Sequence, residues 1–317
     1  MNDVIDFIDR HNSFAVFTHI NPDGDALGSA YALTSALLTY RKKAVVFLLE
    51  NPPHKYDLKE FRPLFQLFSI YNIEDFDAHI SVDCGDRNRL GKVKDIFRDK
   101  PCMNLDHHIS NDNFADVNYV EDAPATGEIV YDIMGALSVP VLRVAQLALY
   151  TAIASDTGNF TYANTTPKSL SIFSELMDAG LDVNYVANRI FNDRSLGATK
   201  LICTFIQNLR LHLEDRLAIS TIMLEDIENA GAKVDDCEAL INYARDVDTV
   251  ELAIFIRELK KDVYKISLRS KDEGVDVAQF ASIYGGGGHK RAAGCLMKGN
   301  IHDIMQDVIR RSEEFIG

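Results

Sequence analysis

The chain of 317 residues is long enough for about two domains, and with 47% hydrophobic and 25% charged residues each half can bury an ordinary core. Its 33 Lys and Arg stand against 47 Asp and Glu, which gives a formal charge of −14. This acidity argues against a protein that tracks long nucleic acid, because such proteins need a basic stripe for the phosphates. A short anionic substrate is compatible with it, since bound cations reverse the field at one site.

The N-terminus, the cysteines and the apolar stretches predict a soluble cytoplasmic protein. The first six residues are acidic and do not resemble a secretory signal. The five cysteines include no Cys-x-x-Cys pair, which is typical of reduced thiols in the cytosol. The most apolar long stretch, 141–154, contains Arg143 and Gln146 and falls short of the ~20 residues of a membrane span. We therefore expect no membrane partner.

The first half of the chain alternates apolar strands with helical periodicity. Strands are expected at 14–18, 44–49, 80–82 and 103–105, and helices at 26–40, 127–137 and 141–155. Strands that read as continuous apolar runs between helices are typical of a parallel sheet covered on both faces. The predicted fold class is therefore α/β, with residues 1–165 as a parallel-sheet domain.

The second half has a different pattern. Residues 166–213 are predicted as a helical connector, and 214–317 as a smaller α+β domain. In that domain we expect a strand at 217–223, a hairpin of 250–258 with 263–269, a helix at 277–283, a strand near 295–297 and a final helix from about 301. The active site is expected in a cleft between the two domains.

Acidic and histidine side chains recur where predicted strands and helices end. They are His19, Asp23, Asp25, Asp83, the triplet Asp106-His107-His108, and Asp156. Because the carboxyl ends of parallel strands meet at one edge of a sheet, these residues are expected to converge there. Carboxylate and imidazole ligands suit Mn²⁺, Mg²⁺ or Fe²⁺ rather than metals that prefer thiolate. Two such cations side by side are a recurring device for hydrolysing phosphate esters.

Each of these residues has a proposed role and an ordinary alternative. Asp83, the central acid, is expected to bridge both cations, although one acid after a strand often serves only as a turn residue. His107 is expected to bind metal while a second residue such as Asp106 holds its other nitrogen. His108 is expected to face the substrate, where it stabilises phosphoryl charge or protonates the leaving oxygen. Asp23 or Asp25 would alternatively only cap the following helix. The alternative for the two histidines is a pair in a surface loop, and the alternative for Asp156 is a turn acid at the end of a helix.

A glycine run is the main candidate for substrate binding in the second half. Gly285, Gly286, Gly287 and Gly288 can present successive backbone N–H groups to an anion, and His289, Lys290 and Arg291 follow directly. The alternative is a flexible loop, which a bare glycine run often forms. Arg269, at the end of a predicted strand, is a further candidate phosphate contact, with an exposed surface arginine as the alternative.

Together these segments resemble the DHH phosphoesterase family, and specifically its members that carry the DHH-associated C-terminal domain with a Gly-Gly-Gly-His signature. The resemblance spans nearly the whole chain, with the motifs in the family's order and spacing. It implies that His19, Asp23 and Asp83 hold one metal, and that Asp25, Asp83, His107 and Asp156 hold the other. His108 would lie at the phosphate, and the 285–289 loop with Arg291 would bind the nucleotide. Mn²⁺ is expected ahead of Mg²⁺ or Fe²⁺.

The two-domain architecture looks like that of the nano-RNase and pAp phosphatases. The resemblance implies hydrolysis of short 5′-phosphorylated oligoribonucleotides such as pApA to nucleoside monophosphates, and of pAp to AMP and phosphate. It also implies no binding of long duplex nucleic acid, and it is compatible with a homodimer. The alternatives are a cyclic di-AMP phosphodiesterase, an inorganic pyrophosphatase, and a non-catalytic nucleotide sensor on the same fold.

Overall fold

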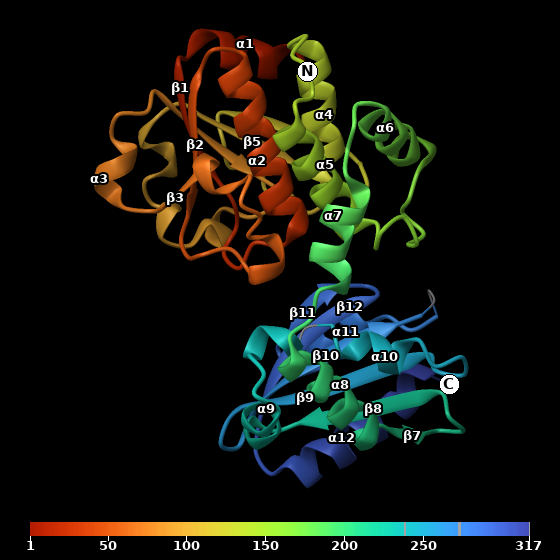
Figure 1. Ribbon diagram of the computed structural model, residues 1–317. Helices are drawn as coiled ribbons and strands as arrows, with labels where there is room; N and C mark the ends of the chain where they lie inside the picture. Colours follow the sequence, from red (N-terminus) through yellow and green to blue (C-terminus); the bar gives the residue numbers. More distant parts are fainter. Residues whose placement is uncertain (238, 272–273, 317) are drawn as a thin grey trace. The chain divides into compact units, whose positions relative to one another are not determined.

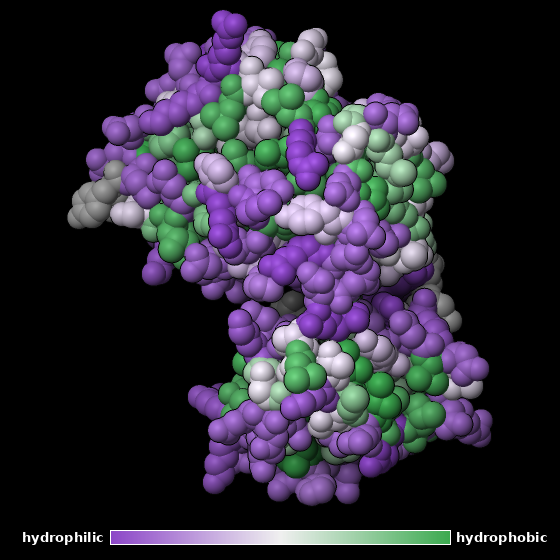
Figure 2. Space-filling model, viewed as in Figure 1, coloured by the Kyte–Doolittle hydropathy of each residue, from purple (hydrophilic) through white to green (hydrophobic). Residues whose placement is uncertain are grey.

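The computed structural model describes residues 1–237, 239–271 and 274–316. The chain falls into two compact units, Met1–Asp193 and Arg194–Gly317 (Figure 1). On the face shown in Figure 2 hydrophilic residues predominate, with apolar residues scattered among them. Within the described part of the chain, no helix combines the length and apolarity needed to cross a bilayer.

A six-stranded parallel sheet forms the centre of the first unit. Its strand order is β3-β2-β1-β4-β5-β6, and every neighbouring pair runs parallel. The strands are β1 (Ser13–Phe17), β2 (Lys43–Leu48), β3 (Phe65–Leu67), β4 (Ala78–Val82), β5 (Cys102–Asp106) and β6 (Val117–Val120). Each residue of β1, β4 and β5 is buried, which explains their continuous apolar sequences. The order reverses between β1 and β4, so the carboxyl ends of these two strands form a topological switch point.

Helices of different length cover the two faces of this sheet. The long helices α2 (Gly24–Thr39), α4 (Thr126–Ala136) and α5 (Arg143–Asp156) pack together on one face, joined at its edge by α1 (Asn2–Arg10). The other face carries a small aromatic cluster with α3 (Ile70–Ile73) and the 3₁₀ segments η3 (Arg87–Val93) and η4 (Phe97–Asp99). Both faces are therefore buried, as a parallel sheet requires.

The second unit contains a mixed sheet of order β11-β12-β10-β9-β8-β7. Its strands are β7 (Arg210–His212), β8 (Leu217–Ile222), β9 (Leu252–Lys260), β10 (Val263–Ser270), β11 (Gly287–His289) and β12 (Ala292–Lys298). Only the β8–β9 pair among these is parallel. One core contains residues of α11 (Val277–Ile283) and α12 (Ile301–Ile316), and a second contains residues of α8 (Leu196–Asn208), α9 (Leu224–Ala230) and α10 (Ile241–Arg245).

The predicted α/β architecture is confirmed, but the helical segment 166–213 does not form a separate layer. Its first part, with α6 (Pro167–Asp178) and α7 (Val183–Ala187), belongs to the first unit, because Ile172 and Leu176 are buried in that core. Its last part, with α8, belongs to the second unit, where Leu201 and Phe205 are fully buried. The apolar faces of α6 and α8 are therefore buried in different cores, which divides the segment between the two units.

Candidate metal centre

The acidic and histidine residues predicted as metal ligands gather at the switch point of the parallel sheet. His19 follows β1 by two residues, and Asp83 directly follows β4, the neighbouring strand. His107 follows β5 in the same way. Three segments that are distant in the sequence therefore supply side chains to one edge of the sheet.

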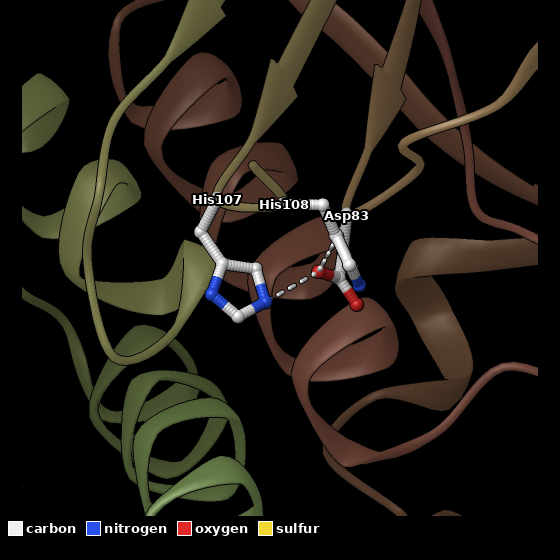
Figure 3. A group of neighbouring side chains, drawn as sticks. All are labelled: Asp83, His107 and His108. Carbon is white, nitrogen blue, oxygen red and sulfur yellow. Dashed lines mark ion pairs between the residues drawn. The ribbon is translucent and has the colours of Figure 1, made fainter. Parts of the chain in front are cut away.

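Asp83 lies at the middle of this group, with its two carboxylate oxygens facing different histidines. Oδ2 is 3.8 Å from Nε2 of His19, and Oδ1 is 3.4 Å from Nε2 of His107. Figure 3 shows the His107 ring pointing toward the Asp83 carboxylate, with His108 beside it. The Asp83 backbone has a φ of 57°, a left-handed conformation that is costly for a non-glycine residue. That conformation turns the chain sharply after β4, at the residue placed between the two histidines.

The first cluster consists of His19, Asp23 and Asp83. Asp23 is the N-cap of α2, because its Oδ1 accepts a hydrogen bond of 3.1 Å from the backbone N–H of Ala26. Its Oδ2 lies 3.8 Å from Nε2 of His19. One oxygen therefore caps the helix while the other faces the cluster, so the helix-cap interpretation and the metal interpretation both apply to Asp23.

The second cluster consists of Asp25, His107 and Asp156. Nε2 of His107 is 3.8 Å from Oδ2 of Asp25 and 3.5 Å from Oδ2 of Asp156. Asp25 lies in the first turn of α2, and Asp156 is the last residue of α5. Gly24 allows this approach, because a Cβ there would lie 1.9 Å from Oγ of Ser155.

The histidines of both clusters are held in the form that binds metal through Nε2. Nδ1 of His19 donates to the backbone carbonyl of Ile20 at 2.7 Å, and Nδ1 of His107 donates to that of Ala123 at 2.9 Å. A donating Nδ1–H leaves the lone pair on Nε2, which in both residues faces the carboxylates. Nε2 of His19 is buried and has no hydrogen-bond partner among the residues that the structure describes.

The prediction that Asp106 holds His107 is wrong. Asp106 instead accepts a hydrogen bond of 2.8 Å from Nδ1 of His108, and its other oxygen accepts one of 2.6 Å from the amide of Asn111. His107 and His108 follow the end of β5, and both rings lie beside Asp83, with which they form a third group of possible ligand atoms. With both oxygens engaged, Asp106 orients His108 and is not placed as a metal ligand.

His108 differs electrostatically from His19. The hydrogen bond to Asp106 raises the pKa of His108 above its ordinary value, whereas burial lowers the pKa of His19. Burial opposes the ionisation of Asp106, but hydrogen bonds from His108 and Asn111 bring the pKa of Asp106 below its usual range. A protonated imidazole donates protons rather than binding cations, which suits His108 to contact an anion.

The carboxylates of the centre repel one another. Burial is the main reason that the pKa of Asp83 lies well above its ordinary value, and the charges of Asp25, Asp23, Asp156 and Asp106 add to the shift. Burial and the charges of Asp25 and Asp23 raise the pKa of Asp156 to about 9. Bound cations would remove this repulsion. The distances between the histidine nitrogens and the carboxylate oxygens are too long for hydrogen bonds, and they are of the kind expected for atoms that each lie ~2.1 Å from a shared ion. The residues present therefore fit divalent cations.

The first turn of α4 contributes to the centre, which the sequence analysis did not predict. The backbone N–H groups of Thr126 and Gly127 donate to the two oxygens of Asp25 at 2.6 and 3.0 Å. The Thr126 hydroxyl donates to Oδ1 of Asp83 at 3.0 Å. In the sequence, the only signal is a Thr-Gly pair at the start of a predicted helix, where N–H groups lack helical partners.

In the second unit, the glycine run is not a loop throughout. The N–H of Gly285 donates to the carbonyl of Ser282 at 3.0 Å, and that of Gly286 donates to Ala281 at 2.9 Å. With φ of 70° at Gly285, this is a Schellman ending of α11. Two of the four amides predicted to cradle an anion are therefore used to end the helix. The next residues, from Gly287 to His289, form the edge strand β11.

The predicted basic residues of the second unit lie close to this strand. Arg269 in β10 pairs with Ala292 in β12, and Ala292 pairs with His289 in β11. The N–H of Ser270 donates to the carbonyl of Arg291 at 3.2 Å. The sheet register therefore brings Arg269, His289 and Arg291 to one end of the β10–β12–β11 ladder.

Two sequence profiles match the chain. Residues 13–155 match the DHH family, N-terminal domain, and residues 214–316 match the DHHA1 domain. The chain therefore contains a DHH domain followed by a DHHA1 domain. The DHH match covers the parallel sheet and all the predicted metal ligands except Asp156, which directly follows its last residue. The DHHA1 match covers most of the mixed sheet, including the glycine run.

This DHH protein is similar to curated relatives over most of its length. It is 29% identical to the bifunctional oligoribonuclease and PAP phosphatase NrnA of Thermus thermophilus, over 90% of this chain and 84% of that one. It is 26% identical to the protein of the same name from Mycoplasma pneumoniae, over 97% and 93% of the two chains. An exopolyphosphatase-related protein from Bacteroides fragilis shares the fold, with a TM-score of 0.92, 22% identity, and coverage of 99% of this chain and 95% of that one.

Proposed function

We propose that this protein is a metal-dependent phosphoesterase that hydrolyses short 5′-phosphorylated oligoribonucleotides to nucleoside monophosphates, and pAp to AMP and phosphate. The observation that carries the proposal is the placement of Asp83, whose two oxygens face two separate histidine and carboxylate clusters. A bridging carboxylate between paired cations is the usual arrangement in two-metal phosphate hydrolysis. The relatives named oligoribonuclease and PAP phosphatase supply the substrate class.

The two clusters give the proposed ligand sets. His19, Asp23 and Asp83 would hold one cation, and Asp25, Asp83, His107 and Asp156 the other. The all-oxygen-and-imidazole ligand set favours Mn²⁺, with Mg²⁺ and Fe²⁺ as weaker candidates. When bound, such a pair of cations activates water at neutral pH and neutralises the charge of the phosphate.

Side chains and backbone groups of the protein would stabilise charge, donate a proton and orient the metal ligands. Asp106 and Asn111 fix the ring of His108 beside the clusters, and the hydrogen bond to Asp106 raises the pKa of His108, which favours its protonated form. A cationic His108 would stabilise charge that develops on the phosphoryl oxygens, or donate its proton to the leaving oxygen. Thr126 and Gly127 would hold Asp25 and Asp83 ionised and correctly oriented.

The second unit would contribute contacts to the rest of the substrate. The residues in this role are Gly285, Gly286, Gly287, Gly288, His289, Arg291 and Arg269. Gly287 and Gly288 on the edge strand, rather than Gly285 and Gly286, would bring backbone close to the ligand, since the first two amides end α11. The positive charges of Arg269 and Arg291 would bind a phosphate.

The proposal is tested by turnover of pApA, pAp, cyclic di-AMP, pyrophosphate and long single-stranded RNA with Mn²⁺, with products resolved by chromatography. We expect AMP from pApA, and AMP with phosphate from pAp. A strong preference for long RNA, or hydrolysis of cyclic di-AMP or pyrophosphate alone, would contradict the proposed substrate class. Binding of nucleotides without turnover of any of them would contradict the proposed activity.

A further inference from the structure

Arg89 lies in η3, which begins at Arg87 shortly after Asp83, and its backbone is fixed beside the metal centre. The N–H of Ile20, next to His19, donates to the Arg89 carbonyl at 2.8 Å. The neighbouring Leu90 is fully buried in the small aromatic core on that face of the sheet. The backbone on both sides of the Arg89 side chain is therefore held in place.

The segment that carries Arg89 passes from His108 to the His19 loop. At its start, a Cβ on Gly85 would lie 3.1 Å from Cβ of His108. At its end, a Cβ on Gly91 would lie 2.6 Å from the side chain of Ile20. Arg89 is thus located between the two histidines that stand at opposite ends of this segment.

The side chain of Arg89 has no hydrogen-bond or ion-pair partner in the part of the chain that the structure describes. Its neighbour Arg87 is different, because the Arg87 guanidinium donates to the carbonyl of Lys94 at 2.9 and 2.7 Å. Arg87 therefore has a structural role within η3. An arginine next to an acidic centre that pairs with none of its carboxylates is available for another anion.

The positive charge of Arg89 acts on both flanking histidines. Burial is the main reason that the pKa of His19 is lowered, and the Arg89 charge lowers it further. The hydrogen bond to Asp106 raises the pKa of His108, and the Arg89 charge opposes that rise. The positive charge of Arg89 therefore acts on the His19–His108 side of the centre.

We propose that Arg89 is a substrate-binding residue that contacts the phosphate at the metal centre. A phosphate that approaches this centre meets several carboxylates, and a planar guanidinium can donate two parallel hydrogen bonds to its oxygens. His108, on the same side, would contact the same group. This inference rests on the proposed phosphoesterase function, because it assumes that a phosphate ester is the ligand.

The test compares Arg89→Gln and Arg89→Lys with the control Lys92→Gln, in the same segment but exposed. Mn²⁺ binding, pApA hydrolysis and AMP binding to the Mn²⁺-loaded protein are measured for each. For Arg89→Gln we expect unchanged Mn²⁺ binding, a loss of roughly 10- to 100-fold in kcat/KM, and a similar loss in AMP affinity. Arg89→Lys should retain part of the kcat/KM and AMP affinity that Arg89→Gln loses, because lysine keeps the positive charge but lacks the planar guanidinium. Lys92→Gln should behave as wild type.

Three outcomes would overturn the inference. An Arg89→Gln protein with kinetics and AMP affinity within about twofold of wild type would exclude a phosphate contact. A loss of Mn²⁺ binding in that variant would assign Arg89 to the metal centre instead. If the wild-type protein hydrolysed no substrate, the proposed function would be contradicted, but the role of Arg89 would still be tested by AMP binding. Equal AMP affinity in wild type and Arg89→Gln, or no AMP binding by either protein, would then contradict the role of Arg89 as well.

Discussion

The hydroxyl of Thr126 donates a hydrogen bond of 3.0 Å to Oδ1 of Asp83, while the N–H of the same threonine donates to Asp25. One residue at the start of α4 thus orients the acid at the middle of the centre and an acid of the second cluster. Partners of this kind are needed to keep metal ligands ionised and aligned.

Replacing Thr126 by valine should therefore weaken the centre without unfolding the protein. Valine keeps the volume and the backbone N–H but removes the hydroxyl, so we expect Mn²⁺ affinity and kcat each to fall roughly 10-fold. Thr126→Ser should stay close to wild type. Thr151→Val is the control, because the buried Thr151 hydroxyl donates to the carbonyl of Leu147 in its own helix. Equal effects at the two positions would show that Thr126 acts only through stability.

The two adjacent histidines should respond differently to the same substitution. His107→Asn removes an imidazole that faces three carboxylates, so it should weaken Mn²⁺ binding. His108→Asn leaves those contacts in place and should retain Mn²⁺, while kcat falls by roughly 10²- to 10⁴-fold because a proton donor is lost. Metal binding measured by calorimetry, together with pApA turnover, separates the two roles. Loss of metal from His108→Asn would contradict the assignment.

Alanine substitutions at the adjacent residues Gly287 and Gly288 should separate an effect on stability from an effect on substrate binding. A Cβ on Gly288 would lie 2.5 Å from the carbonyl oxygen of Ala292, at a φ of 146°, so Gly288→Ala should destabilise the second unit by about 1–3 kcal/mol. A Cβ on Gly287 meets nothing within 4 Å, so Gly287→Ala should fold with an unchanged Tm. If β11 approaches the substrate, Gly287→Ala should still raise KM. An unchanged KM for pApA would argue against substrate contact at this strand.

His79 should make the protein less stable in mild acid. Its ring is buried in β4 against Phe17, its Nδ1 donates to the carbonyl of Phe97 at 3.0 Å, and burial lowers its pKa. The folded protein therefore binds this proton less readily than the unfolded chain, whose histidine titrates near 6.5. Stability attributable to neutral His79 is present above about pH 6.5 and is lost as the pH falls below it.

Thermal unfolding of wild type and His79→Phe between pH 5 and 8, with a chelator present, measures this effect. The variant should lose less stability than wild type as the pH falls, because phenylalanine does not titrate. The acidic cluster is the same in both proteins, so it cancels in the comparison. Parallel curves over the whole range would show that His79 does not contribute to the acid sensitivity.

The sequence was sufficient to predict which residues gather at the metal centre, because each one follows a strand or borders a helix of a parallel sheet. His19, Asp83 and His107 could be placed at one sheet edge on that argument alone. The partner of Asp106 could not be predicted in this way, because strand periodicity ends with β5 at Asp106 and both histidines follow it. Our prediction therefore paired Asp106 with the wrong histidine.

Other contacts depend on packing that local patterns do not contain. Thr126 reaches Asp83 across 43 residues of sequence, and the docking of α4 against β5 brings them together. Gly285 and Gly286 read as part of an anion cradle, but the carbonyls at the end of α11 take up their N–H groups. The division of the segment 166–213 likewise follows from which core buries each helix.

The central claim is that Asp83 joins two cation sites into one hydrolytic centre, and one measurement on Asp83→Ala tests it directly. Mn²⁺ stoichiometry and pApA turnover are determined on the same samples of wild type and variant. We predict two Mn²⁺ per chain with turnover for wild type, and weakened binding at both sites with turnover abolished for Asp83→Ala. Near-normal turnover by the variant, or weakened binding at only one site, would contradict the bridging role of Asp83.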